Sequence, residues 1–243
     1  MTFNQYHVTL KLRRMKSRFI NSDHLPQILN LSHDLSVMTW NILKRCALYE
    51  EPQKFYNNGF GIIESQYQYY VRLKKVACEI SDIVNRDTTI KCIALQEMPI
   101  EEDLEIFREY LKEVMPNFSL ITYKTQGFLF ENTIEVQDKT NELLAIIGKT
   151  SNKIQVIKAC DLVFVNIHLC WFKSFSSRIA AIKKILSELN EKSVILGDFN
   201  FNILDTEIEG VAKHGERDTT LVYNIDNGMQ KLNTCDGFII YEP

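Results

Sequence analysis

The chain has 243 residues, of which 45% are hydrophobic, 11% aromatic and 24% charged, and these proportions exclude a disordered, collagen-like or coiled-coil protein. Twenty-eight Lys and Arg against thirty-one Asp and Glu give a net charge of −3. The chain therefore lacks the overall positive charge that is typical of a passive nucleic-acid-binding module. The longest apolar run covers only residues 143–147, far short of the ~20 residues that a membrane-spanning helix needs.

The cysteines and the N-terminal residues indicate in which cellular compartment the protein folds. Six cysteines are scattered without a CxxC pair, at positions 46, 78, 92, 160, 170 and 235. This pattern favours reduced core thiols over a disulfide framework. The first thirty residues carry polar and charged side chains throughout, with no apolar segment typical of a secretory signal. We therefore predict an intracellular, cytoplasmic protein.

The N-terminal residues predict a short extension ahead of the main domain. Residues 7–12 alternate in polarity like a strand, and the basic cluster between Arg13 and Arg18 is interpreted as a solvated surface turn rather than a nucleic-acid or membrane patch. The chain contains no repeat, low-complexity stretch or linker. We predict an extension of residues 1–34 followed by one domain of residues 35–243.

Strands and helices alternate through that domain. Helical spacing predicts one helix whose apolar stripe begins at Tyr69, a second that begins after Pro99 with an acidic first turn, and a third capped by Ser176 or Ser177. Strands that are apolar almost throughout must be covered on both faces, which predicts a layered α/β fold. The predicted strands are residues 36–43, 92–95, 118–123, 143–147, 154–158, 162–169, 193–196 and 238–241.

Polar residues stand at the ends of four of these strands, where α/β proteins build their sites. They are Asn41, Glu97, His168, and Asp198 with Asn200. Each alone has an ordinary explanation as a turn residue, a solvated carboxylate or a satisfied core histidine. Together they supply the carboxylate and amide oxygens that Mg²⁺ prefers, and Mg²⁺ takes one or two protein carboxylates while keeping water and phosphate as further ligands.

The series of motifs resembles the endonuclease/exonuclease/phosphatase superfamily of Mg²⁺-dependent phosphoesterases. The matching segments are TWNIL (39–43), LQE (95–97), NIHL (166–169) and GDFN (197–200), and Arg72 and Arg178 also look like the family. The long insertion around residues 56–60 looks closest to the deadenylase-like branch. The resemblance implies a four-layer sandwich of two mixed β-sheets flanked by helices, the deoxyribonuclease I-like fold, with the site at one edge.

The resemblance also implies a role for each site residue. Glu97 would be the principal metal ligand, with Asn41 beside it, and the metal would be Mg²⁺ or Mn²⁺ rather than Zn²⁺. Asp198 would orient or deprotonate the attacking water, Asn200 would hold the scissile phosphate, and His168 would donate to its oxygens. The substrate would be a phosphodiester or phosphomonoester in a nucleic acid, or a phospholipid or inositol phosphate head group.

One feature of the family is not found where it is expected. The family ends with a Ser-Asp-His-type motif that supplies a metal-ligating Asp and the catalytic His, but the last histidine here is His214, in a segment interpreted as an exposed loop. Asp236 resembles the Asp of the family's preceding strand, which orients that histidine. On this interpretation Asp236 lacks its partner, the last strand is missing, and the sheet keeps an open edge beside the site.

Three functions follow as alternatives. The first is a Mg²⁺-dependent phosphoesterase, with weak hydrolysis expected because the terminal motif is missing. The second is a catalytically impaired member of the same fold that acts as a binding module. The third is a divergent phosphoesterase that uses His214 as a substitute.

Overall fold

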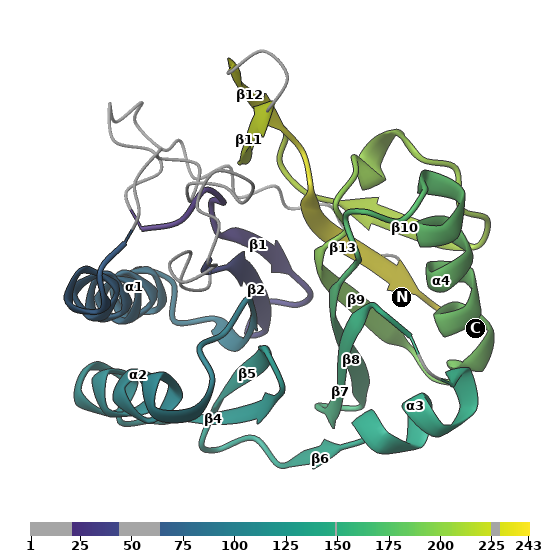
Figure 1. Ribbon diagram of the computed structural model, residues 1–243. Coiled ribbons are helices and arrows are strands. Elements are labelled where there is room, and N and C mark those ends of the chain that lie inside the picture. Colours follow the sequence, from purple (N-terminus) through teal and green to yellow (C-terminus); the bar gives the residue numbers. More distant parts are fainter. Residues whose placement is uncertain (1–20, 44–63, 149, 225–228) are drawn as a thin grey trace.

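The computed structural model describes residues 21–43, 64–148, 150–224 and 229–243, and its strands form two large sheets and a hairpin (Figure 1). The first sheet has the order β1-β2-β3-β5-β4 and the second β10-β13-β9-β8-β7-β6. The first comprises β1 (Gln27–Asn30), β2 (Ser36–Asn41), β3 (Ile90–Gln96), β4 (Phe118–Tyr123) and β5 (Gln126–Glu131). The second comprises β6 (Val136–Asp138), β7 (Lys153–Ala159), β8 (Leu162–His168), β9 (Ser193–Asp198), β10 (Val211–His214) and β13 (Asp236–Tyr241), and β11 (Thr220–Asn224) pairs with β12 (Met229–Asn233).

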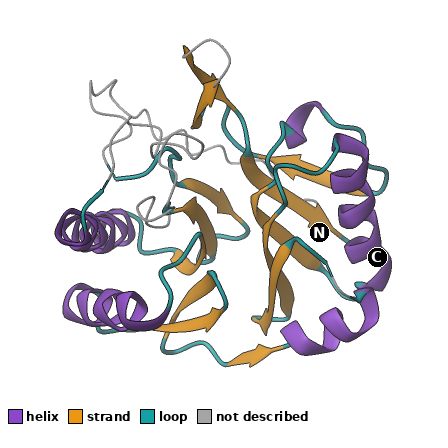
Figure 2. Cartoon of the chain, viewed as in Figure 1, coloured by secondary structure: helices purple, strands orange, loops and turns teal. Residues whose placement is uncertain are grey.

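Helices cover the outer face of each sheet, as Figure 2 shows. Helices α1 (Gln66–Arg86) and α2 (Glu101–Val114) lie on the first sheet, and α3 (Thr140–Ile147) and α4 (Phe175–Glu188) on the second. Three apolar cores follow: one under α1 and α2, one under α3 and α4, and one between the sheets that includes Phe128, Phe164 and Phe238. The predicted four-layer α/β sandwich of two mixed sheets is confirmed.

The strand directions bring the motif ends to one edge of the sandwich. Strands β2 and β3 are parallel, with Asn41 opposite Gln96, and β8 and β9 are parallel, with His168 opposite Asp198. Strand β13 runs antiparallel to β9 and places Asp236 opposite Asp198. Since carboxyl ends of parallel strands meet at the same edge, residues far apart in the sequence become neighbours there.

A buried polar bridge joins the two sheets beneath this edge. The Asn166 side chain on β8 donates to the carbonyls of Leu95 (2.9 Å) and Gly127 (3.0 Å). Its Oδ1 accepts from Gln96 at 2.8 Å and from Gln126 at 3.0 Å. Buried amides are stable only when they are paired in this way, and the network fixes β8 of one sheet against β3 and β5 of the other. Asn166 and Gln96 therefore hold the framework on which His168 and Glu97 stand.

Helix boundaries follow local capping chemistry. Ser65 begins α1 with a capping box, in which its hydroxyl accepts from the Gln68 amide and the Gln68 side chain accepts from the Ser65 amide. The acidic first turn predicted for α2 is present. Helix α4 is capped by Ser174, so the predicted cap at Ser176 or Ser177 is wrong by one turn or less.

Two further predictions about secondary structure are wrong. Residues 143–147 belong to helix α3 rather than to a strand, and Leu143 and Ile147 face the core one helical turn apart while Ile146 is 59% exposed. His214 ends strand β10, which pairs with β13, so its segment is not the exposed loop that was expected. The predicted strand at residues 7–12 and the insertion at 56–60 lie outside the described residues.

The described part of the predicted N-terminal extension lies within the fold. Strand β1 pairs antiparallel with β2, with Gln27 opposite Thr39, and both Leu29 on the strand and Leu31 directly after it are buried. Strand β13 lies between β9 and β10, so the expected open edge at β13 is absent. The boundary predicted at residue 35 therefore falls between two paired strands of one sheet.

Smaller predictions concern the thiols and the helices. The five cysteines in the described ranges (Cys78, Cys92, Cys160, Cys170 and Cys235) are free. Among the described helices, none has the length and apolarity to cross a bilayer.

We expect Gly197→Ala to lower the free energy of unfolding by about 3 kcal/mol or more. Gly197 has φ +141°, and a Cβ there would lie 2.0 Å from the backbone oxygen of Ile167 on β8. The two strands that carry His168 and Asp198 would have to separate. Urea unfolding measures the loss, and Gly210→Ala is the control because Gly210 also has a positive φ (+75°) but no neighbour within 4 Å. Equal losses for the two variants would contradict the clash as the cause.

Candidate active site

Asp198, at the end of β9, is the centre of the site. Its carboxylate is buried, accepts from the Asn41 side chain at 3.1 Å through Oδ2, and accepts from the Asn200 backbone N–H at 2.8 Å through Oδ1. The same Oδ2 lies 3.7 Å from Nε2 of His168. Burial raises the pKa of Asp198, against the opposing effect of the two nearby histidines, His24 and His168.

Glu97 and His168 form the next part of the cluster. Nε2 of His168 lies 3.8 Å from Oε1 of Glu97, so one imidazole edge faces two carboxylates. Glu97 directly follows β3 and has φ +56°, a left-handed conformation that costs a non-glycine residue about 1 kcal/mol. The turn ends β3 at the site, where the Glu97 carboxylate lies beside the His168 ring.

Asn41 and Asn200 flank Asp198 on two sides. The Asn41 Oδ1 accepts from the Leu43 N–H at 3.1 Å, so its amide group is oriented with the NH₂ towards Asp198. Asn200 also has a left-handed φ of +55°, and its side-chain NH₂ donates to the Leu169 carbonyl at 2.7 Å. The structure thus brings together all five strand-end residues that the sequence analysis selected.

Asp236 has a histidine partner, contrary to the sequence analysis. Nδ1 of His24 lies 2.7 Å from Oδ2 of Asp236, and the Thr220 hydroxyl donates to the same oxygen at 2.8 Å. Both His24 and Asp236 are buried. Since Nδ1 is engaged by Asp236, Nε2 is the nitrogen directed to the site, where it lies 3.9 Å from Oδ2 of Asp198 and 3.8 Å from Oδ1 of Asp23.

His24 belongs to the tripeptide Ser22-Asp23-His24, which resembles the Ser-Asp-His-type motif sought at the end of the chain. The sequence signal was therefore present in full, followed by Leu-Pro and an apolar strand, but it stands before TWNIL instead of after GDFN. The resemblance places such a motif downstream of Asp236, so Ser22-Asp23-His24 was not among the predicted site residues. His214, the proposed substitute, lies on β10 and is not part of the His24 cluster.

Backbone contacts on two sides fix the 22–24 segment in place. The Ser22 hydroxyl donates to the Asn41 carbonyl at 2.6 Å, and the Trp40 indole donates to the His24 carbonyl at 2.9 Å. On the other side, the Leu221 N–H donates to the Asp23 carbonyl at 2.7 Å. The segment thus lies between β2 and β11, which presents Asp23 and His24 to the strand ends.

Arg72 ties the segment to the rest of the site from the α1 side. This buried guanidinium donates to Glu64 through Nε (2.8 Å) and Nη2 (3.0 Å). It also donates to the backbone carbonyls of Asn21 (3.0 Å), Ile42 (2.8 Å) and Leu43 (2.8 Å). These five contacts use all five N–H donors of an arginine. Arg72 therefore joins the residues before Ser22 to the residues after Asn41.

Crowded charge shapes the electrostatics of the site. Burial raises the pKa of Asp23 from 3.8 to about 6; His24 opposes the rise, and the negative charges of Glu97 and Asp198 add to it. Burial alone would lower the pKa of His24, but the carboxylates of Asp236, Asp23 and Asp198 outweigh it and raise that pKa well above 6.5. A protonated His24 therefore partly neutralises a group of mutually repelling carboxylates.

The donor set fits a hard divalent cation. The negative charge of Glu97 raises the pKa of Asp23, so the two carboxylates repel one another, and a divalent cation would relieve this repulsion. His24, Asp198 and Asp236 also have ligand atoms within 4.8 Å of one another, but Nδ1 of His24 and Oδ2 of Asp236 already bind each other. Burial raises the pKa of the nearby Cys235 thiol far above its usual range.

We expect Asp23→Asn to stabilise the chelated protein at pH 7.5 by up to about 3 kcal/mol and to change little near pH 4. Because the pKa of Asp23 rises from 3.8 to about 6 on folding, its contribution to stability is present below pH 3.8 and is lost as the pH rises through about 6. The amide cannot ionise and avoids this loss. Urea unfolding in EDTA measures it, with the exposed Asp161→Asn as control. A stabilisation that is equal at both pH values would contradict the charge repulsion.

Two facing mixed sheets, helices on both outer faces and a carboxylate–histidine site at the strand ends define the deoxyribonuclease I-like fold. Solved structures confirm this fold. TDP2 from D. rerio, complexed with single strand DNA product, gives a TM-score of 0.53 at 14% identity, covering 87% of this chain and 85% of that chain. SeMet TDP2 from Caenorhabditis elegans gives 0.51 at 15% identity and covers 86% of this chain. This chain spans only 64% of the length of the C. elegans chain.

Neither a family model nor a curated protein sequence matches the chain. The likeness to the solved structures therefore concerns the fold alone, and it agrees with the fold that the sequence resemblance implies.

Proposed function

We propose that the chain is a divalent-metal-dependent phosphoesterase that hydrolyses a phosphate ester by in-line attack of water. The observation that supports this most directly is the hydrogen bond of 2.7 Å between His24 and Asp236, beside the carboxylate of Asp198. Burying a His–Asp pair beside a second carboxylate lowers the stability of the fold. Such arrangements are therefore found mostly at functional sites. It completes the set of groups that phosphoryl transfer needs.

The metal would be held by Glu97 and Asp23, with Asn41 beside them. When bound, Mg²⁺ or Mn²⁺ would neutralise negative charge on the phosphate oxygens. The residues fit this group because the donors are oxygens and two of them are carboxylates, one with a pKa raised by burial and neighbouring charge.

The protein side chains would position the water and the phosphate. Asp198, held by Asn41 and the Asn200 backbone, would orient the attacking water and accept its proton. Nε2 of His24 and Nε2 of His168 lie 3.9 and 3.7 Å from the same oxygen, Oδ2 of Asp198. Both would donate to phosphate oxygens as their charge increases, and Asp236 would keep Nε2 of His24 pointing inward.

The alternative of a catalytically impaired binding module had one support, the absence of the terminal Asp-His pair. In this proposal Asp23 and His24 take the place of that pair, which argues against the binding module. The weak hydrolysis expected on the same ground is no longer the expectation, and the full chain should turn over substrate.

Hydrolysis of bis-p-nitrophenyl phosphate by the full chain tests the proposal. We expect turnover that requires Mg²⁺ or Mn²⁺, is lost in EDTA, and falls about 10²–10⁴-fold in Asp198→Asn. Glu97→Gln should raise the Mg²⁺ concentration needed for half-maximal rate. Glu102→Gln, an exposed carboxylate in the first turn of α2, is the matched control and should leave both quantities unchanged. Turnover that persists in EDTA or in Asp198→Asn would overturn the proposal.

A further inference from the structure

Two exposed aromatic rings follow the site on a short loop. Trp171 is 60% and Phe172 67% exposed, and their rings meet edge to face at 84°, with centroids 5.8 Å apart. Phe175 is also exposed but packs against Phe201 at 5.1 Å, so Trp171 and Phe172 are the pair held away from the core. Exposing two large neighbouring rings is unfavourable in water, which marks this loop as a contact surface.

The loop is fixed to the site by backbone contacts. The Leu169 N–H donates to the Asp198 carbonyl at 2.9 Å, and the Leu169 carbonyl accepts from the Asn200 side chain. One residue further, the Cys170 N–H donates to Oδ1 of Asn152 at 2.9 Å. Trp171 is therefore three residues after His168, and the backbone of both residues between them, Leu169 and Cys170, is hydrogen-bonded.

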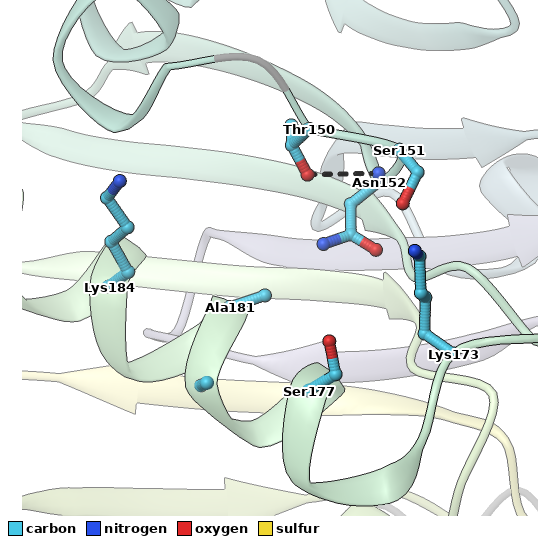
Figure 3. Close-up of a pocket in the computed structure, with 8 residues that line it drawn as sticks. Thr150, Ser151, Asn152, Lys173, Ser177, Ala181 and Lys184 are labelled. Carbon is cyan, nitrogen blue, oxygen red and sulfur yellow. Dashed lines mark hydrogen bonds between the residues drawn. The ribbon is translucent and has the colours of Figure 1, made fainter.

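A groove begins at Asn152, the residue that binds the Cys170 N–H of this loop. It has a volume of about 530 Å³ and lies between α4 and the residues that lead into β7. Figure 3 shows the Ser177 hydroxyl and the Asn152 amide facing one another across it, with Lys173 at one end and Lys184 at the other. We call this the lysine groove, defined by Thr150, Ser151, Asn152, Lys173, Ser177 and Lys184.

The lysine groove is positive in a protein of negative net charge. None of the residues that line it is acidic, although the chain carries −3 overall. Nζ of Lys184 donates to the Ile147 carbonyl at 2.6 Å, which holds this ammonium at the groove wall, and Nζ of Lys173 lies 5.9 Å from the centre of the Phe172 ring. Ammonium, hydroxyl and amide donors in one groove suit a phosphate group.

We propose that Trp171 and Phe172 stack bases, and the lysine groove binds a backbone phosphate, of a single-stranded nucleic acid whose scissile phosphate lies at Asp198. This inference rests on the proposed phosphoesterase function. Flat rings beside a basic groove are the two elements of single-strand binding, because every base offers a face and every nucleotide a charge. A lipid bilayer would suit the rings equally, but a groove of about 530 Å³ beside them, lined by hydroxyl and amide side chains as well as lysines, suits a phosphate that enters it.

Fluorescence anisotropy with a labelled twelve-nucleotide oligo(dT), in EDTA so that nothing is cleaved, tests the inference. We expect Trp171→Ala to weaken binding by about 10-fold and Trp171→Phe to restore most of the loss. Lys173→Gln/Lys184→Gln should weaken binding and lower the slope of log K against log salt by about 1.4, as for two lost contacts on a single strand. Lys75→Gln/Lys112→Gln, on the opposite helical layer, is the charge-matched control.

The small diester separates this inference from the proposed function. Bis-p-nitrophenyl phosphate needs only the phosphate site, so Trp171→Ala should leave its turnover unchanged while turnover of an oligonucleotide falls. Absence of diester turnover in the wild type would reject the proposed function, and oligonucleotide binding in EDTA would still decide the inference. Oligonucleotide binding that is unaffected by these variants overturns the inference. So does Trp171-dependent sedimentation with phosphatidylserine vesicles in place of oligonucleotide binding.

Discussion

Replacing His24 with Ala should reduce hydrolysis of bis-p-nitrophenyl phosphate by about 10²–10⁴-fold, although His24 precedes every other site residue in the chain except Ser22 and Asp23. The variant removes the imidazole whose Nε2 faces Asp198 and leaves the buried Asp236 carboxylate without its histidine. The rate should fall mainly through kcat, because the donor acts as charge increases on the phosphate. Steady-state kinetics at saturating Mg²⁺ measures the change.

Loss of folding must be separated from loss of chemistry in this variant. Asp236 loses a partner in His24→Ala, which costs stability, so the double variant His24→Ala/Asp236→Ala removes the unpaired charge. Its rate should be close to that of the single variant, since the two residues act as a unit. Added imidazole should partly restore the rate of the double variant.

The control for His24 is a histidine outside the site. His33→Ala changes an exposed residue in the turn between β1 and β2 and should retain the wild-type rate. Wild-type turnover in a folded His24→Ala variant would show that the chemistry does not use this residue. The role of Asp236 in orienting it would then also be wrong.

The five strand-end residues could be predicted because their signal is local. Each polar residue directly follows an apolar strand, and parallel strands bring their carboxyl ends together whatever the loops between them do. Asn41, Glu97, His168 and Asp198 are neighbours for this reason. Asn166 and Gln96 show the limit of the same reasoning, since they stand in the same motifs but turn inward and join the sheets.

The errors have physical causes too. The apolar run at 143–147 is as compatible with a short helix as with a strand, and only the packing of Leu143 and Ile147 against the second sheet decides between them. His24 was missed because a motif was sought in its usual order along the chain. The position of a segment in the fold does not depend on its order along the chain. Here a short antiparallel hairpin places β1 beside β2, and the residues before β1 reach the site.

The last prediction follows from that arrangement: a chain that begins at residue 35 and carries residues 1–34 after Pro243 should assemble the same site. Asp236 begins β13 at the site and Tyr241 ends it, so the end of β13 is about 17 Å from the site. The twenty residues before Asn21 would follow Pro243, and a chain of that length reaches at most about 70 Å, so it can return Ser22-Asp23-His24 to the strand ends.

Deleting residues 1–34 should lower the diester hydrolysis rate by at least ~10²-fold, because it removes Asp23 and His24. The deletion should also destabilise the fold, because it exposes the edge of β2 and removes the buried Leu29 and Leu31. The transposed chain should recover most of both losses, because β1 can pair with β2 without the hairpin between them. The same transposed chain with His24→Ala should recover stability but not rate. A transposed chain that unfolds like the wild type yet stays as inactive as the deletion would show that the 22–24 segment acts by some means other than its place beside Asp236 and Asp198.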